Sequence, residues 1–146
     1  MASLVDTNIL VYCFDTRDLA KREAARKLLR RGAAAETLAI PHQALIEFIS
    51  VVTRRKLRGS ALLPEEEAIR QAEGLMADFP VLYPNEHLFR TALHGMAAYR
   101  LPWFDAHIWA YAEHYGLPEI LSEDFEHGRR YGTVRVKNPF LEIGPA

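Results

Sequence analysis

The sequence predicts a single α/β domain over residues 1–146, a three-layer α/β/α sandwich around a mostly parallel sheet of about five strands. Three observations support this fold class. A chain of 146 residues has the usual length of one domain. Short apolar runs alternate with longer segments of helical pattern. Because strands separated by helices need crossover connections, they normally pair in parallel, with helices on both faces of the sheet.

The first half of the chain alternates between strand and helix patterns. Its predicted elements, in order, are a very short strand at Leu4 and Val5, a helix over 8–12, a helix over 19–31, a strand over 37–41 and a long apolar helix over 42–55. Asp18 precedes the second of these helices, where an aspartate side chain can cap free N–H groups. Gly32 follows the same helix, where glycine commonly ends one.

The second half of the chain continues this alternation. Its predicted elements, in order, are a helix that begins at Pro64 with three glutamates, a strand over 81–84, a helix from 86 to about 100, a helix over 103–115, a strand over 119–122 and a strand over 133–136. Asn85 is a suitable N-cap for the helix that follows it. Gly116 is a suitable end for the helix over 103–115.

The composition is that of an ordinary globular protein, with 49% hydrophobic and 25% charged residues. No apolar run approaches the roughly 18 residues of a membrane-spanning helix, and the N-terminus lacks a signal-peptide pattern. Cys13 is the only cysteine, so no intrachain disulfide is available and a cytoplasmic location is expected. Its apolar neighbours indicate a buried, unreactive thiol.

The overall charge does not indicate a nucleic-acid-binding protein, because the formal net charge is −1 and the pI is near 6.6. Basic side chains nevertheless gather in three places, at 21–31, at 54–58 and at the pair Arg129 and Arg130. Such runs usually form solvated helix faces and loops, but they also suit the phosphates of a nucleic acid. The sequence leaves both interpretations open.

Four carboxylates lie in unusually apolar segments. Asp6 directly follows the first strand, and Asp124 comes just after the strand over 119–122. Glu47 interrupts the apolar segment ALIEFISVV, and Asp105 lies in the first turn of the helix that continues as AHIWAYA. Because an unpaired buried charge is costly, each of these acids needs either solvent or a partner.

Taken singly, three of the acids have structural explanations that involve no active site. Glu47 could form an ion pair with Arg54 or Arg55, and Asp105 could cap its helix or interact with the helix dipole. Asp124 could stabilise a turn with Gly128. Taken together, the four acids fit another interpretation. Ligands of parallel sheets bind beyond the carboxyl ends of the strands, where the strand order reverses. Asp6 and Asp124 follow strands and are therefore expected at this edge of the sheet. The helices that flank the edge can position Glu47 and Asp105 beside them.

A cluster of four acids would need a cation. Two unit charges about 5 Å apart repel by roughly 3 kcal/mol at an effective dielectric constant of about 20, so the cluster would be partly protonated without one. All-oxygen ligands, without paired cysteines or a histidine-rich spacing, suit Mg²⁺ or Mn²⁺ rather than Zn²⁺. Such ions serve phosphodiester hydrolysis by polarising the phosphate and lowering the pKa of the attacking water.

The segments VDTNILVY, ALIEF, FDAHIWAYA and LSEDF, in this order, resemble the PIN-domain nucleases, and most of all the VapC-type toxins of prokaryotic toxin–antitoxin pairs. The resemblance covers essentially the whole chain. It implies a Mg²⁺- or Mn²⁺-dependent endoribonuclease that cleaves RNA and is silenced by a small cognate antitoxin. It also implies a homodimer that meets DNA only through the antitoxin.

The resemblance also assigns roles to individual positions. The acidic constellation that it implies is Asp6, Glu47, Asp105 and Asp124. The metal ligands expected from it are Asp6, Asp105 and Asp124, while Glu47 would complete the site or orient water. The polar supporting groups expected from it are Thr7, Asn8 and Ser122, the last at a position where threonine is more frequent. Glu123 is a neighbouring candidate, but alternate side chains of an extended segment point in opposite directions, and the register favours Asp124.

Other polar and aromatic residues receive no role in the site. The histidines share no ligand spacing with the acids and are expected at the surface or the edge of the core; they are His42, His87, His94, His107, His114 and His127. Four aromatic side chains could stack on bases, but their helical spacing favours the core or a subunit interface; they are Trp103, Phe104, Trp109 and Tyr111.

Two other functions stay open from the residues alone. A phosphatase on a similar sheet could use Asp6 as a covalent nucleophile, but such phosphatases usually carry a second aspartate two residues later, where this chain has Asn8. A non-catalytic RNA-binding module could keep the acids as part of its surface, but four intact acids argue against it.

Overall fold

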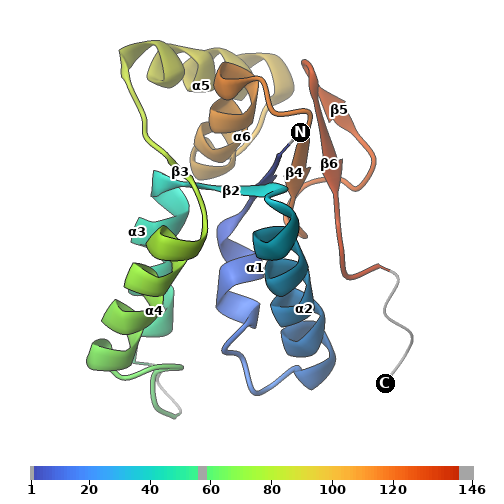
Figure 1. Ribbon diagram of the computed structural model, residues 1–146. Coiled ribbons are helices and arrows are strands. Elements are labelled where there is room, and N and C mark those ends of the chain that lie inside the picture. Colours follow the sequence, from blue (N-terminus) through green and yellow to red (C-terminus); the bar gives the residue numbers. More distant parts are fainter. Residues whose placement is uncertain (1, 56–58, 142–146) are drawn as a thin grey trace.

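The computed structural model describes residues 2–55 and 59–141 and shows the three-layer α/β/α sandwich that the sequence predicts (Figure 1). Within these residues the central sheet has the strand order β3-β2-β1-β4-β6-β5. The strands are β1 (Ser3–Val5), β2 (Leu38–Pro41), β3 (Val81–Leu82), β4 (Glu119–Leu121), β5 (Arg130–Tyr131) and β6 (Val134–Lys137). The helices are α1 (Thr7–Tyr12), α2 (Leu19–Ala35), α3 (His42–Val52), α4 (Glu65–Asp78), α5 (Glu86–Tyr99) and α6 (Trp103–Tyr115).

The two faces of the sheet belong to two different cores, because successive residues of a strand point to opposite sides. Val5 and Leu121 pack into a core with α1, α2, α3 and α4. Leu4 and Ile120 pack into a second core with α5 and α6. Figure 1 shows this separation, with α5 and α6 together on one side of the sheet. Burial on both faces explains why the central strands are continuous apolar runs.

The strand order reverses between β1 and β4. From β1 the chain moves outward to β2 and then β3, and it later returns to the other side of β1 as β4. β1 and β4 are parallel, with Val5 opposite Leu121. Their carboxyl ends therefore lie at the same edge of the sheet, and the residues that follow these two strands meet at the switch point.

Gly32 does not end α2, contrary to the sequence prediction. The helix continues to Ala35 and ends where Glu36 adopts a left-handed backbone conformation with a φ of 56°. Gly32 is buried instead, and a Cβ atom built on it would lie 2.1 Å from Cδ1 of Leu38 in β2. The glycine thus permits this close approach, because a side chain at position 32 would force Leu38 or the helix to shift.

The number of strands and several element ends also differ from the prediction; for example, the strand predicted over 81–84 is β3 (Val81–Leu82). The sheet has an additional edge strand, β5, which runs antiparallel to β6, while the other strand pairs are parallel. β5 has only two residues, too few to show the alternation that identifies a strand in a sequence. The long helix predicted over 42–55 ends at Val52. Residues 56–58 of the basic run lie outside the described residues.

The predicted core positions are largely confirmed. Cys13 is 4% exposed, and burial raises the pKa of its thiol to about 12, so it is the inert core thiol that the sequence predicts. Trp109 and Tyr111 are buried, whereas Phe104 is 67% exposed. Across the described ranges, none of the helices combines the length and the apolar character that crossing a bilayer requires.

Candidate active site

Asp6 stands at the switch point, at the carboxyl end of β1, and is 4% exposed. It is the N-cap residue of α1, and its Oδ1 accepts a 2.6 Å hydrogen bond from the N–H of Thr7. Its Oδ2 accepts a 2.7 Å hydrogen bond from the hydroxyl of Ser122, which directly follows β4 and is fully buried. The N–H of Asp6 donates to the carbonyl of Leu121. Both central strands therefore fix the position of this carboxylate.

Asn8 and Ser122 connect Asp6 with Asp124. The side-chain nitrogen of Asn8 lies 3.1 Å from Oγ of Ser122 and 3.1 Å from Oδ2 of Asp124. The N–H of Asp124 donates to Oγ of Ser122 at 3.0 Å. The Asp124 residue is exposed, unlike Asp6. The structure thus places two of the predicted supporting residues between the two strand-end acids.

Glu47 reaches the same site from α3. Its Oε2 accepts a 2.9 Å hydrogen bond from the hydroxyl of Thr7, and its Oε1 accepts a 2.7 Å hydrogen bond from the side-chain amide of Gln43. The alternative partner Arg54 turns its guanidinium toward the hydroxyl of Ser50 instead. Glu47 is therefore held by neutral donors from α1 and α3.

Asp105 lies in the first turn of α6 and is half-buried. Burial raises its pKa to about 6, and the charges of Asp124 and Glu47 add to the rise. Burial likewise raises the pKa of Asp6 to about 7, against the hydrogen bonds from Ser122 and a backbone N–H, and the charges of Asp124 and Asp105 raise it further. The charges of Asp124 and Asp105 thus act on Asp6, and those of Asp124 and Glu47 act on Asp105, so the four predicted acids, which are far apart in the sequence, lie in the same region of the fold.

In the part of the chain that the structure describes, the groups that donate hydrogen bonds to Asp6, Glu47 and Asp124 are neutral. The salt bridges formed within the described ranges all involve other acids. Carboxylate oxygens with hydroxyl and amide support match the ligand preference of Mg²⁺ or Mn²⁺. Among the described residues, no three Asp, Glu, His or Cys side chains are already arranged as a metal-binding group. Two properties of these residues suit a bound cation: their oxygen atoms are the ligand type that Mg²⁺ and Mn²⁺ prefer, and a cation would relieve the repulsion between their carboxylates.

Glu123 points away from the acid cluster. Its carboxylate accepts a hydrogen bond from the Tyr12 hydroxyl and a 2.8 Å hydrogen bond from Nζ of Lys21. The same ammonium lies 5.0 Å from the centroid of the Tyr12 ring. The structure therefore favours Asp124 over Glu123 as the site residue, in agreement with the strand register in the sequence.

Two further residues beside the site were not predicted from the sequence. Gln43 is buried and contacts both Glu47 and the backbone carbonyl of Phe104. The ring of His107 is hydrogen-bonded to Gln43. The only usable signal was the spacing of four residues between Gln43 and Glu47, which places both on one face of a helix.

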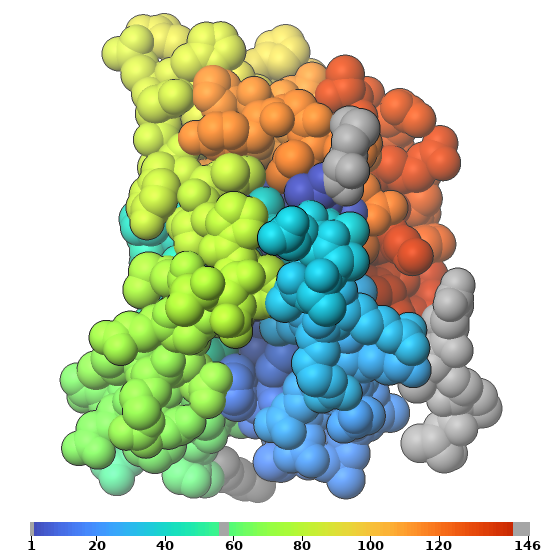
Figure 2. All heavy atoms as spheres, in the orientation of Figure 1, coloured from blue at the N-terminus to red at the C-terminus, as the bar shows by residue number. Residues whose placement is uncertain are grey.

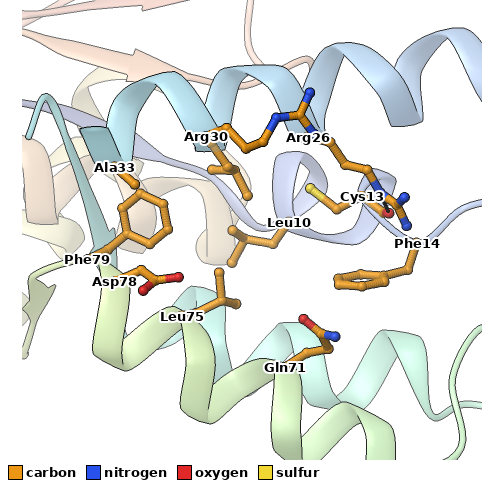
Figure 3. A pocket seen from close by; sticks show the side chains of 11 residues that line it. Leu10, Cys13, Phe14, Arg26, Arg30, Ala33, Gln71, Leu75, Asp78 and Phe79 are labelled. Carbon is orange, nitrogen blue, oxygen red and sulfur yellow. Dashed lines mark hydrogen bonds between the residues drawn. The ribbon is translucent and has the colours of Figure 1, made fainter. Parts of the chain in front are cut away.

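A groove of about 530 Å³ lies between α2 and α4, with α1 behind it (Figure 3). Apolar side chains of all three helices line it, among them Leu10 of α1, Leu29 of α2 and Leu75 of α4. Arg26 and Arg30 project from α2 along its margin, as Figure 3 shows. Figure 2 shows this face of the molecule, with the green atoms of α4 beside the blue atoms of α2. None of the four acids lines this groove.

Several solved structures share this fold. A toxin–antitoxin complex from Klebsiella pneumoniae is 18% identical to this chain, with a TM-score of 0.66, covering 94% of this chain and 98% of that chain. VapBC2 from Rickettsia felis, bound to a promoter DNA fragment, is 14% identical, with a TM-score of 0.68 and the same coverage, 94% and 98%. VapC20 from Mycobacterium tuberculosis, described as a sarcin-ricin loop cleaving toxin, is 15% identical, with a TM-score of 0.62, covering 84% and 90%.

At the level of sequence, no curated protein matches this chain. A family model for the PIN domain, however, matches residues 3–132. This match spans most of the chain, from the start of β1 beyond the end of β4, and includes all four acids of the site. The chain therefore belongs to the PIN domain family.

Proposed function

We propose that this chain is a metal-dependent endoribonuclease that hydrolyses RNA phosphodiester bonds, and that it is the toxin of a type II toxin–antitoxin pair. One observation carries the proposal: the four acids, which follow β1 and β4 or lie on α3 and α6, are near enough for their charges to raise the pKa values of Asp6 and Asp105. Among the described residues, the hydrogen-bond donors to Asp6, Glu47 and Asp124 are neutral groups. Membership of the PIN domain family supports it, since a related fold belongs to a toxin that cleaves the sarcin-ricin loop.

In this proposal Asp6, Asp105 and Asp124 hold a Mg²⁺ or Mn²⁺ ion. When bound, the ion supplies an activated water and polarises the scissile phosphate. The chain's own groups prepare the site: Ser122 holds Oδ2 of Asp6, and Asn8 holds Oδ2 of Asp124. Because burial and repulsion favour protonation of Asp6, the ion must compete with a proton for this carboxylate.

Glu47 has a different part in the proposal. Its two oxygens accept hydrogen bonds from Thr7 and Gln43, so the carboxylate is held in one orientation. Neither bond neutralises its charge, and the carboxylate keeps lone pairs free for a water molecule. We assign to Glu47 the orientation of water at the edge of the acid cluster.

We place the antitoxin in the groove between α2 and α4. The apolar lining of this groove suits the apolar side chains of a short segment, and Arg26 and Arg30 at its margin suit acidic side chains on the same segment. Toxin–antitoxin complexes are among the structures that share the fold. The groove and the acid cluster share no lining residue, so antitoxin binding and RNA cleavage can be tested separately.

A homodimer is also part of the proposal. Several large apolar side chains of α5 and α6 are exposed, including Phe104 at 67%, Phe89 at 46% and Leu93 at 43%. Exposed apolar side chains grouped on neighbouring helices are typical of a surface that another protein covers. We therefore expect a second copy of the chain to bury these residues.

The proposed chemistry is tested by RNA cleavage with antitoxin-free protein. We expect structured RNA to be cut in Mg²⁺ or Mn²⁺ and left intact after chelation. Asp6→Asn should abolish cleavage, because it removes the most buried acid of the cluster. Asp18→Asn is the matched control, since asparagine caps a helix as well as aspartate does and Asp18 caps α2, outside the site. Cleavage that survives chelation or the Asp6→Asn change contradicts the proposal.

A further inference from the structure

Gln43 connects the two helices that carry Glu47 and Asp105. It lies in the first turn of α3 and is 8% exposed. Its side-chain nitrogen is 2.7 Å from Oε1 of Glu47 and 3.0 Å from the carbonyl oxygen of Phe104. Phe104 directly precedes Asp105 in the first turn of α6. One buried amide therefore touches an acid on α3 and the backbone next to an acid on α6.

The two acceptors determine which way this amide points. An ionised carboxylate and a backbone carbonyl can only accept hydrogen bonds, so the group between them must be the NH₂ of Gln43. Both N–H bonds are then used. The amide oxygen consequently faces Nδ1 of His107, with which it is hydrogen-bonded. Because an amide oxygen only accepts, Nδ1 of His107 must carry the hydrogen.

Aromatic packing holds the His107 ring in this orientation. The ring lies edge-on to Tyr111, with 5.3 Å between centroids, and 5.8 Å from the ring of Trp103. Phe89 on α5 packs against it at 6.2 Å. These rings restrict rotation of the imidazole, so Nδ1 stays directed at the oxygen of Gln43.

Loss of this orientation would disturb Glu47. In the structure Oε1 of Glu47 accepts from Gln43 while Oε2 accepts from Thr7, so both oxygens are fixed. If the amide of Gln43 turned over, its oxygen would face the carboxylate oxygen of Glu47, and two acceptors would repel each other. A donor from His107 makes the productive orientation the favoured one.

We propose that Gln43 is a positioning residue that holds Glu47 and the first turn of α6 in place, and that His107 acts through Gln43 by fixing the direction of its amide. The kinetic consequences of this inference rest on the proposed nuclease function. Its structural consequence, a particular tautomer of His107, does not.

Kinetics on a defined RNA oligonucleotide test the first part. Gln43→Met keeps the side-chain volume but removes both N–H donors, and His107→Leu removes the donor to the amide oxygen. We expect each change to lower kcat by roughly 10- to 100-fold, because displaced catalytic groups react slowly. The KM for RNA should change by less than about threefold, since uniform substrate binding is untouched. His114→Leu, near the other end of α6, is the control and should leave kcat unchanged.

The double variant shows whether the two residues act in series. If His107 acts only through Gln43, the variant with both changes should be no slower than Gln43→Met alone. Losses that multiply in the double variant, or a KM that rises while kcat stays constant, would overturn the inference. Thermal unfolding of each variant separates misplacement of the acids from loss of the fold, because a positioning role leaves the transition cooperative.

Nitrogen-15 NMR of the imidazole supplies a readout that needs neither RNA nor metal and can be made on the wild-type chain. We expect the hydrogen of neutral His107 on Nδ1, and its redistribution toward Nε2 in Gln43→Met. A hydrogen on Nε2 in the wild-type protein contradicts the inference. A wild-type protein that has the Nδ1–H tautomer but cleaves no RNA contradicts the proposed function and leaves the Gln43–His107 arrangement standing.

Discussion

The hydroxyl of Ser122 donates a 2.7 Å hydrogen bond to Oδ2 of Asp6, although 116 positions separate the two residues. The bond crosses from the end of β4 to the end of β1, the point where the strand order reverses. It lowers the pKa of Asp6 while burial raises it, and burial dominates. The site thus contains a carboxylate whose ionisation depends on one hydroxyl and on its neighbours' charges.

Removing this hydroxyl should weaken cation binding. In Ser122→Ala the pKa of Asp6 rises further, so a proton competes more strongly with the ion. We expect the affinity for Mn²⁺, measured by calorimetry, to fall about 10-fold, the scale found for groups that orient metal ligands. Ser122→Thr keeps the hydroxyl and should retain most of the affinity; an equal loss in both variants would contradict this account.

The raised pKa values predict an unusual pH dependence for the metal-free protein. The folded chain keeps protons on Asp6, to about pH 7, and on Asp105, to about pH 6, whereas the unfolded chain releases them near the ordinary value of 3.8. Because the folded state binds more protons in this window, the free energy of unfolding should fall as the pH rises from about 4 to about 7. Chemical denaturation at a series of pH values, in the presence of a chelator, measures this free energy of unfolding.

The same measurement on Asp6→Asn provides the check. The variant lacks the carboxylate with the larger rise in pKa, so its unfolding free energy should depend less on pH and exceed the wild-type value by about 1–3 kcal/mol above pH 7. Identical pH profiles for both proteins would show that the burial of Asp6 is not costly.

A pair of glycine substitutions tests the packing of α2 on the sheet. Gly32→Ala should destabilise the protein by about 1–3 kcal/mol, because the new Cβ would lie 2.1 Å from Cδ1 of Leu38. Gly74→Ala in α4 meets no atom within 4 Å and should stabilise the protein by about 0.5–1 kcal/mol through helix propensity. Urea denaturation distinguishes them; stabilisation by both would mean that Gly32 is not closely packed.

Charge reversal at the groove tests the proposed antitoxin site. Arg30 lines the groove, while the next residue, Arg31, lies outside it and is also exposed. Arg30→Glu should weaken binding of the cognate antitoxin by about 10-fold, or 1.4 kcal/mol, and leave RNA cleavage unchanged. Arg31→Glu should change neither. Equal losses of binding in the two variants would point to a general charge effect instead of a groove contact.

The sequence predicted the architecture and the acids because both leave local signals. Continuous apolar strands alternate with capped helices, and Asp6 and Asp124 directly follow two such strands. Topology then brings the ends of parallel strands together without any need for side-chain detail. Glu47 and Asp105 were recognisable as charges in apolar helices. In the structure Glu47 is hydrogen-bonded to Thr7, the residue after Asp6, and the charge of Asp124 acts on Asp105.

What the sequence did not predict depends on contacts between distant segments. The hydrogen bond of His107 to Gln43 joins residues 64 positions apart, and nothing near either residue indicates it. Gly32 follows the pattern of a helix end, and only the proximity of Leu38 explains its presence inside α2. β5 is defined by its antiparallel pairing with the edge of β6. A two-residue strand has no sequence pattern from which it could be predicted.

A crystal of the antitoxin-free protein soaked in Mn²⁺ tests the central claim most directly. The account predicts an anomalous peak at the switch point, within bonding distance of carboxylate oxygens from Asp6, Asp105 and Asp124. Crystals of Asp6→Asn treated in the same way should show a weaker peak or none. A wild-type crystal with no peak among these carboxylates, or with a lysine or arginine side chain lying between them, would contradict the account.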